Sequence, residues 1–214
     1  MDSQAGALLQ RYLEELYVWN RRVNLTSIPR AQAESRHLDE TRRLLEAAAP
    51  EPGARVADVG SGGGVPGLVL AILRPDLRVT LIESDRRRAG FLVHAAALCE
   101  RPGVVVLPRR AEDVGHDPAH RAVYDLAVSR ATAAPAVLCE LALPLLRPGG
   151  ALMALVADAQ SSAAAAAEAS RTCGGGTPRP AGPGILAVTK EAETPDAYPR
   201  RAGIPSRRPL GART

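Results

Sequence analysis

The sequence predicts an α/β fold: a mostly parallel β-sheet with helices on both faces, preceded by a helical segment. From Arg55 onward, short runs rich in branched aliphatic residues alternate with helical stretches. Strands that are separated by helices usually pair in parallel, with the helices covering the sheet on both sides. Hydrophobic residues make up 46% of the 214 residues, which is enough for one domain with a sizeable core.

Before position 50 the apolar residues recur at helical spacing. Leu9, Tyr12, Leu13 and Leu16 fall on one face of a first helix, and a second helical stretch covers residues 31–49. A Pro-Gly turn at 52–53 then marks the change of pattern. We therefore divide the chain into an N-terminal helical extension (1–50), a sheet domain (51–192) and a basic C-terminal tail (193–214).

Within the sheet domain the strands and helices follow each other in order. The predicted strands cover residues 55–59, 79–83, 104–107, 126–129, 152–156 and 185–190, and the predicted helices cover 66–73, 86–99 and 135–146. Pro148-Gly149-Gly150 is a tight turn that leads into the fifth strand. Residues 157–184 have low complexity, with an alanine run followed by glycines and prolines, and we expect one helix and then a partly flexible loop.

The charge of the chain comes almost entirely from arginine. The net charge is +4 and the isoelectric point about 9.3, and Lys190 is the single lysine. Many arginines stand in pairs, which favours a phosphate-rich partner because each neutralised phosphate releases counterions. Aromatic residues form only 3% of the chain, so a stacking platform for single-stranded bases is not expected.

Several classes of protein are excluded by composition. The three cysteines are scattered, which is typical of buried thiols in a reducing cytoplasm and not of a disulfide framework or a metal site. No apolar run is long enough to span a membrane, and the first residues lack the basic start of a signal peptide. The four histidines stand apart from one another, and we expect them to be structural or exposed.

The strongest local signal is a glycine cluster that follows the first predicted strand. Gly62, Gly64 and Gly67 match the dinucleotide pattern G-x-G-x-x-G, in which the loop receives a pyrophosphate. Gly60, Gly62 and Gly64 instead match the D-x-G-x-G-x-G loop of class I methyltransferases, where the methionine end of S-adenosylmethionine lies. A purely structural turn is the third interpretation, and the glycines alone do not decide among the three.

Two carboxylates favour the methyltransferase register. Asp58 lies two residues before the first glycine, where it can engage a cofactor ammonium through water or hold the loop; beside a pyrophosphate it would be repelled. Glu83, at the end of the second strand, is placed to accept hydrogen bonds from ribose hydroxyls. We therefore expect Asp58, Gly62 and Glu83 to contribute to an S-adenosylmethionine site.

Further segments resemble one family throughout, the small-subunit ribosomal RNA methyltransferase G, also called glucose-inhibited division protein B. The resemblance rests on W-N-x-x-x-N-L-T at 19–26, Arg36-His37-Leu38, D-V-G-S-G-x-G-x-P-G at 58–67, Phe91-Leu92, R-A-E-D at 110–113, Ser129-Arg130-Ala131 and R-x-G-x-P-x-R-R-P-L at 201–210. It covers residues 8–156 and 185–210. The chain departs from the family at Asp39-Glu40-Thr41, and at Val156, where relatives carry a lysine.

The resemblance implies a class I methyltransferase fold, which is a Rossmann-like sheet, and S-adenosylmethionine as the cofactor. Gly60, Val65, Ala111, Glu112 and Arg130 fall on positions that contact the cofactor in the family. Arg130 ends the fourth predicted strand, where it can face either the cofactor carboxylate or an RNA phosphate. No metal is expected.

The family methylates N7 of a guanine in 16S small-subunit ribosomal RNA. This nitrogen carries a lone pair and no proton, so no catalytic base is expected in the chain. We expect Arg21, Arg22, Arg207 and Arg208 to flank the cleft and bind the phosphates of ribosomal RNA, free or in an assembled subunit. Two alternatives stay open: a methyltransferase that acts on a small molecule, and a non-catalytic RNA-binding protein that keeps the fold.

Overall fold

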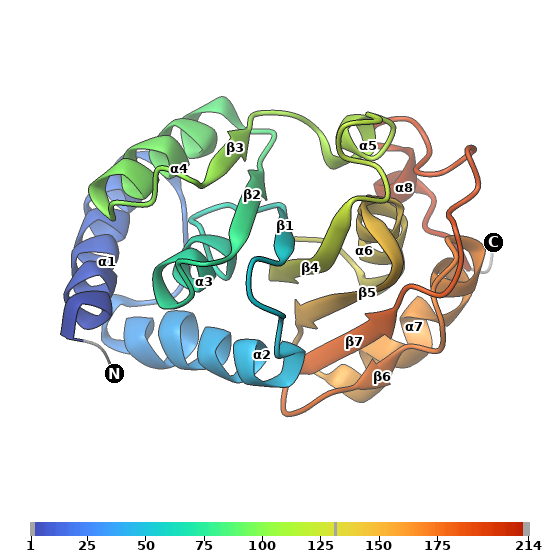
Figure 1. Cartoon of the computed structure of the whole chain (residues 1–214), viewed down its shortest axis with the longest axis horizontal. Helices are drawn as coiled ribbons and strands as arrows, with labels where there is room; N and C mark the ends of the chain where they lie inside the picture. Colours follow the sequence, from blue (N-terminus) through green and yellow to red (C-terminus); the bar gives the residue numbers. More distant parts are fainter. Residues whose placement is uncertain (1–2, 131, 212–214) are drawn as a thin grey trace.

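A seven-stranded β-sheet forms the centre of the molecule (Figure 1). The computed structural model describes residues 3–130 and 132–211. The strand order is β3-β2-β1-β4-β5-β7-β6, in which the first five strands are parallel and β7 runs antiparallel to β5 and to β6. The strands are β1 (Arg55–Val59), β2 (Arg78–Ile82), β3 (Val105–Leu107), β4 (Tyr124–Arg130), β5 (Leu146–Leu155), β6 (Arg179–Pro180) and β7 (Ile185–Thr189).

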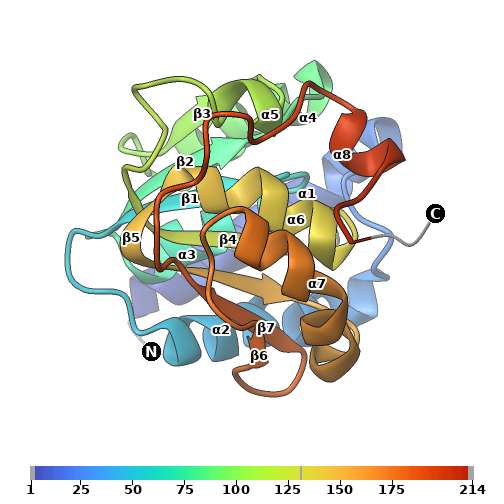
Figure 2. The same ribbon diagram turned by 90° about the vertical axis from the view of Figure 1, so that its right-hand side faces the viewer.

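Helices cover both faces of this sheet, as the sequence predicts. They are α1 (Ser3–Val23), α2 (Glu40–Ala48), α3 (Gly67–Leu73), α4 (Arg86–Leu98), α5 (Ala111–Val114), α6 (Pro135–Ala142), α7 (Ala159–Thr172) and α8 (Ile204–Arg207). Successive residues of a strand point to opposite faces. Val56 accordingly packs in a core with α1 to α4, whereas Ala57 packs in a second core with α6 and α7. Figure 2 shows α6 and α7 in front of the sheet.

The expected α/β architecture is confirmed, and its boundaries need correction at three places. The helix expected at 135–146 ends at Ala142, because Pro144 lies in a short 3₁₀ turn and Leu146 already begins β5. The turn at Pro148-Gly149-Gly150 lies inside β5, where pairing with β4 steps from Leu146 to Ala151. The second N-terminal helix is a 3₁₀ turn (Arg30–Gln32), a π-helix (Glu34–Asp39) and α2 in succession.

The segment at 157–184 contains α7, as expected, and then the short strand β6 in place of part of the expected loop. Asp158 caps α7 by accepting a hydrogen bond from the Ser161 N–H at 2.6 Å. After α7, the Gly175 N–H donates to the Ser170 carbonyl and the Gly176 N–H donates to the Thr189 carbonyl. These bonds join the glycine-rich segment to α7 and to β7.

The C-terminal tail lies on the surface and is tied to the body by buried partners. Arg200 donates two hydrogen bonds to the Glu140 carboxylate, at 2.8 and 2.7 Å, and Glu140 is fully buried on α6. Arg121 donates to the carbonyl oxygens of Thr194 and Tyr198. The expected tail runs to position 214, and its last three residues lie outside the described part of the chain.

Within the ranges 3–130 and 132–211, no helix has both the length and the apolar character needed to cross a membrane.

Candidate active site

A cavity of about 690 Å³ opens at the carboxyl ends of the parallel strands. Its wall includes Val59 from β1, Ile82 from β2, Arg130 from β4 and Leu155 from β5. The chain leaves β1 toward β2 on one side of the sheet and returns through β4 on the other, so this is the switch point where open α/β sheets bind ligands. The volume is within the range of about 300–1,000 Å³ that small-molecule sites occupy. The cavity brings together these predicted cofactor residues: Gly60, Gly62, Val65, Glu83, Ala111, Glu112 and Arg130.

The glycine loop begins where β1 ends. Gly60 has a φ of +72°, in the left-handed region that favours glycine. A Cβ at Gly60 would overlap the Thr132 side chain, so a larger residue would fit at this position only if that side chain moved. The N–H groups of Gly60 and Ser61 both donate to the Ile82 carbonyl, at 2.9 and 3.1 Å, which ties the loop to the end of β2.

Asp58 holds this loop against α3. Its buried carboxylate accepts a hydrogen bond from the Gly67 N–H at 3.0 Å, at the first residue of α3. The second carboxylate oxygen, Oδ1, has no hydrogen-bond partner within the described residues and can still accept a donor. Burial raises the pKa of Asp58 to about 7, although the hydrogen bond from Gly67 and the neighbouring Ser61 hydroxyl oppose that effect.

The geometry at Asp58 separates the two glycine registers. In a dinucleotide site the pyrophosphate lies at the helix N-terminus, where the second glycine of the pattern lets the backbone approach it. Here the first amide of α3, the Gly67 N–H, already donates to the Asp58 carboxylate, which would repel a pyrophosphate at this helix end. The geometry therefore favours the methyltransferase register.

Glu83 joins the loop from the other side. Its Oε2 atom accepts from the Gly62 N–H at 2.9 Å and its Oε1 atom accepts from the Asp85 N–H at 2.8 Å. Only 6% of the residue is exposed, and it lines the cavity. A carboxylate has about four acceptor positions, so about two remain for the hydroxyls of a sugar.

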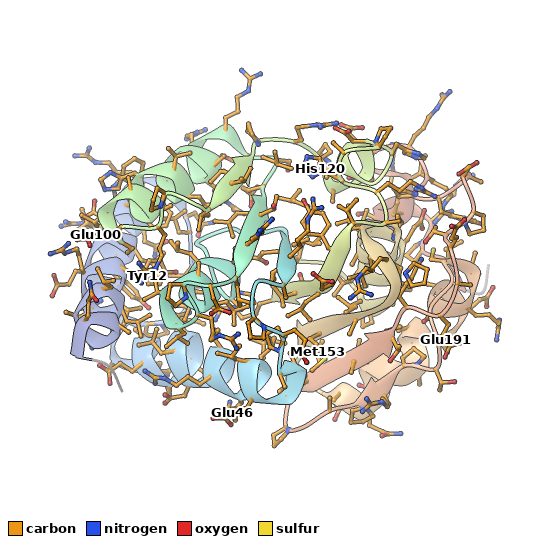
Figure 3. The ribbon with its side chains drawn as sticks, in the orientation of Figure 1. Tyr12, Glu46, Glu100, His120, Met153 and Glu191 are labelled. Carbon is orange, nitrogen blue, oxygen red and sulfur yellow. The ribbon has the colours of Figure 1, made fainter. Side chains whose placement is uncertain are left out.

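The N-terminal helix α1 supports the loop from behind, a contact that the sequence analysis missed. The fully buried Tyr12 donates from its hydroxyl to the Gly63 carbonyl at 2.6 Å. A Cβ at Gly63 would lie 2.9 Å from Leu16 Cδ1, so α1 rests directly on the loop. Figure 3 shows Tyr12 on the side of α1 that faces α3.

Glu112 begins the opposite wall, where α5 follows β3. It is only 2% exposed, so it is a buried carboxylate and not a surface one. Its Oε1 atom accepts from the Gly203 N–H at 2.9 Å and from Arg110 at 3.2 Å. Burial acts to raise the pKa of Glu112, but these two donors outweigh burial and lower it. The C-terminal tail therefore contacts the cavity wall directly.

Arg130 closes the site at the end of β4. Its Nη1 atom donates to the Arg36 carbonyl and to His37 Nδ1, both at 2.8 Å. The part of the chain that the structure describes gives it no carboxylate partner, so its charge is available to an anionic ligand. The neighbouring Ala131 of the family motif lies outside the described residues.

Further arginines that were not predicted as site residues line the cavity, although all but Arg36 stand in pairs or a triplet in the sequence. The cavity is also lined by Arg36, Arg43, Arg88, Arg109 and Arg110. The four arginines expected to bind RNA lie outside this lining. Arg22 instead lines a shallow hollow with Arg87 and Arg88, and Arg88 belongs to both. Ser206, in α8 beside Arg207, reaches the cavity lining.

The histidines hold the structure together, as expected. His94 bonds to Glu15, His116 to the Pro199 carbonyl, and His120 to the Tyr124 hydroxyl. His37 is buried and accepts from Arg130. Over the described ranges, no three His, Cys, Asp or Glu side chains form a group that could hold a metal ion.

This strand order, with its reversed β7 and a cavity at the β1–β4 switch point, is that of the class I methyltransferase fold. Solved structures with the same fold include the antibiotic-resistance methyltransferase Kmr (TM-score 0.53, 18% identity, covering 69% of this chain and 91% of that one). Another is the T. thermophilus 16S rRNA N2 G1207 methyltransferase (TM-score 0.52, 22% identity, covering 74% of this chain and 40% of that one).

Sequence comparison gives the family. The model of the rRNA small subunit methyltransferase G family matches residues 6–178. The ribosomal RNA small subunit methyltransferase G of Roseiflexus castenholzii is 42% identical over 220 residues, covering 98% of this chain and 94% of that protein. Its counterpart from Moorella thermoacetica is 38% identical over 215 residues, covering 95% and 90%. The chain belongs to the rRNA small subunit methyltransferase G family.

Proposed function

We propose that this protein transfers the methyl group of S-adenosylmethionine to N7 of a guanine in 16S ribosomal RNA. The proposal rests on family membership and on one structural observation: a glycine loop fixed by Asp58 and Glu83 at the mouth of an arginine-rimmed cavity. The site of action is then the cytoplasm, where bacterial ribosomal RNA is found.

The residues of the cavity fit this cofactor chemically. The loop residues Gly60, Gly62 and Val65, with Asp58 behind them, suit the amino-acid end of the cofactor. Backbone N–H groups of the loop can donate to the cofactor carboxylate, and the Asp58 carboxylate can bind the cofactor ammonium. Glu83 suits the ribose hydroxyls. Ala111 and Glu112 form a wall for the adenine, and Arg130 supplies a cation for the carboxylate of the methionine end.

When bound, the cofactor supplies an electrophilic methyl group on a sulfonium. The residues of this chain then need only to bind, align and shield the reactants, because guanine N7 presents a lone pair without a proton. No side chain has to remove a proton. This agrees with the histidines, which are occupied in structural hydrogen bonds away from the cavity, apart from His37 behind Arg130.

The RNA contacts follow from charge. Arg21, Arg22, Arg207 and Arg208, together with the arginines of the cavity rim, bind phosphates around the target base. Each phosphate contact contributes about 0.7–0.9 to the slope of log affinity against log salt concentration. Changing Arg21 and Arg22 to Gln should therefore weaken RNA binding and flatten this slope by about one to two, with cofactor affinity unchanged. An unchanged slope would refute the assignment of these two residues.

The direct test is mass-spectrometric mapping of 16S ribosomal RNA from cells with and without the gene. We expect one N7-methylguanine to disappear in the deletion strain and to return with the wild-type gene. Assays on free 16S RNA and on assembled small subunits then identify the substrate form. Unmodified RNA together with activity on free metabolites would favour a small-molecule methyltransferase. RNA binding without adenosylhomocysteine binding in calorimetry would favour a non-catalytic RNA-binding protein.

A further inference from the structure

The guanidinium of Arg130 is held from one side only. Both hydrogens of Nη1 are used, one by the Arg36 carbonyl and one by His37 Nδ1, each at 2.8 Å. The three remaining N–H groups, on Nε and Nη2, have no hydrogen-bond partner among the residues that the structure describes. Because the side chain also lines the cavity, these three donors are available to a ligand there.

His37 can accept this bond only in one protonation state. Its Nδ1 atom faces the Arg130 N–H and must carry a lone pair. Its Nε2 atom lies 3.4 Å from the Tyr17 hydroxyl and 3.4 Å from the Thr26 hydroxyl. The Tyr17 hydroxyl donates to the Ile28 carbonyl, and Thr26 Oγ1 accepts from the Ile28 N–H, so each oxygen retains a lone pair for an Nε2 proton. The surroundings therefore select the neutral imidazole with its proton on Nε2.

Electrostatics keep the ring in this state. His37 is completely buried, and burial together with the charges of Arg130 and Arg36 lowers the pKa of His37 to about 3. The Glu40 carboxylate nearby is engaged by Arg36 at 2.7 Å. A protonated ring would lose the acceptor and place a second cation against Arg130. At neutral pH the imidazole is therefore a fixed acceptor.

The backbone around His37 is shaped to present it. The residue lies in the π-helix Glu34–Asp39, where the Glu40 N–H bonds back five residues to the Ser35 carbonyl. Single π-helical turns are frequent at functional sites because they reposition one side chain. The Thr41 hydroxyl donates to the His37 carbonyl at 2.7 Å and fixes the turn. The same turn supplies the Arg36 carbonyl, which is the second acceptor of Arg130.

We propose that His37 is a positioning residue for the cofactor site: its neutral imidazole orients Arg130 to bind the carboxylate at the methionine end of the cofactor. The inference rests on the proposed function. It assigns to the N-terminal extension a part in cofactor binding, through a side chain that does not touch the cofactor.

The test compares two ligands that differ in that carboxylate. Adenosylhomocysteine contains it, whereas 5′-methylthioadenosine keeps the adenosine and the sulfur and lacks the whole amino-acid part. Calorimetry with the full chain should show that His37→Leu lowers the affinity for adenosylhomocysteine about tenfold, or about 1.4 kcal/mol. The affinity for methylthioadenosine should stay within about twofold of the wild-type value. His37→Asn should stay close to wild type, because its amide oxygen can take the place of Nδ1.

Two further variants keep the test decisive if His37→Leu fails to fold. Gln at position 37 is as polar as Asn, but its amide reaches the position of Nε2. His37→Gln should therefore lower the affinity for adenosylhomocysteine and leave the affinity for methylthioadenosine unchanged. In an Arg130→Met background, none of the His37 substitutions should change adenosylhomocysteine affinity further.

The outcomes separate the two levels of the argument. A wild-type protein that binds neither ligand would overturn the proposed function itself. A wild-type protein that binds both, with His37→Gln weakening them equally or not at all, would overturn the inference and leave the function standing.

Discussion

Replacing Tyr12 with Phe removes one hydroxyl from the contact between α1 and the glycine loop. Burial raises the pKa of Tyr12, so its hydroxyl keeps its proton and donates to the Gly63 carbonyl at 2.6 Å. Both residues are buried, so water cannot replace the lost donor. The ring still fills its place in the core, and the change therefore isolates a single hydrogen bond.

The expected cost is that of leaving one buried carbonyl without a partner, about 1–3 kcal/mol. At about 2 kcal/mol, and with about 2–4 °C per kcal/mol for a protein of this size, Tm should fall by about 4–8 °C. Because the freed carbonyl belongs to the loop that lines the cavity, affinity for adenosylhomocysteine should fall as well. Urea unfolding measures the first effect and calorimetry the second.

Tyr124→Phe is the matched control. The Tyr124 ring is also buried, and its hydroxyl bonds to His120 at 2.7 Å. The residue begins β4, at the end of the sheet opposite the cavity. This control should lose stability and keep its cofactor affinity. The reasoning is refuted if Tyr12→Phe costs less than about 0.5 kcal/mol, or if both variants lose affinity equally.

Three other perturbations test the packing around the site. The pKa of Asp58 is about 7 in the folded state against an ordinary value of 3.8, so between these two pH values the folded state binds one more proton than the unfolded state. The stability of the free protein should therefore fall as pH rises from about 4 to about 7. Asp58→Asn should remove this pH dependence when stability is measured by urea unfolding. Gly67→Ala should lower the free energy of unfolding by more than about 2 kcal/mol, because the new Cβ would lie 2.5 Å from Asp58 Oδ2. Gly90→Ala is the control: its Cβ would have nothing within 4 Å, so thermal melting should show a neutral or stabilising effect. Arg200→Met removes the charged partner of the buried Glu140 carboxylate and leaves only the Arg200 backbone N–H as its donor, so the free energy of unfolding should fall by about 3 kcal/mol. A Glu140→Met change in the same chain should recover much of that loss.

The parallel sheet was predictable because its strands are short, apolar and separated by helices of ordinary length. Residues 55–59 form β1 as expected, and the last strand differs from the expectation by one residue. The helices α5 and α8 were not predicted. Each has four residues, which is too few to show a helical period. The step in pairing within β5 depends on the neighbouring strand and leaves no pattern in β5 itself.

The residues of the site were likewise only partly predictable from the sequence. Asp58 lies near the end of β1 and Glu83 directly follows β2, so their place at the carboxyl edge of the sheet could be inferred from their position in the chain. The partners that fix the site could not. His37 meets Arg130 across 93 positions, and Glu112 meets Gly203 across 91. Such contacts depend on how helices and tail pack, and no local spacing encodes them.

The hydrogen bond from Gly203 to Glu112 makes one wall of the cavity depend on a segment far away in the chain. The glycine loop is held by Asp58, Glu83 and Tyr12, all of which precede position 84. Glu112 instead receives its amide donor from Gly203, 91 positions later. A truncation before Gly203 would therefore keep the supports of the loop and remove this donor from the opposite wall.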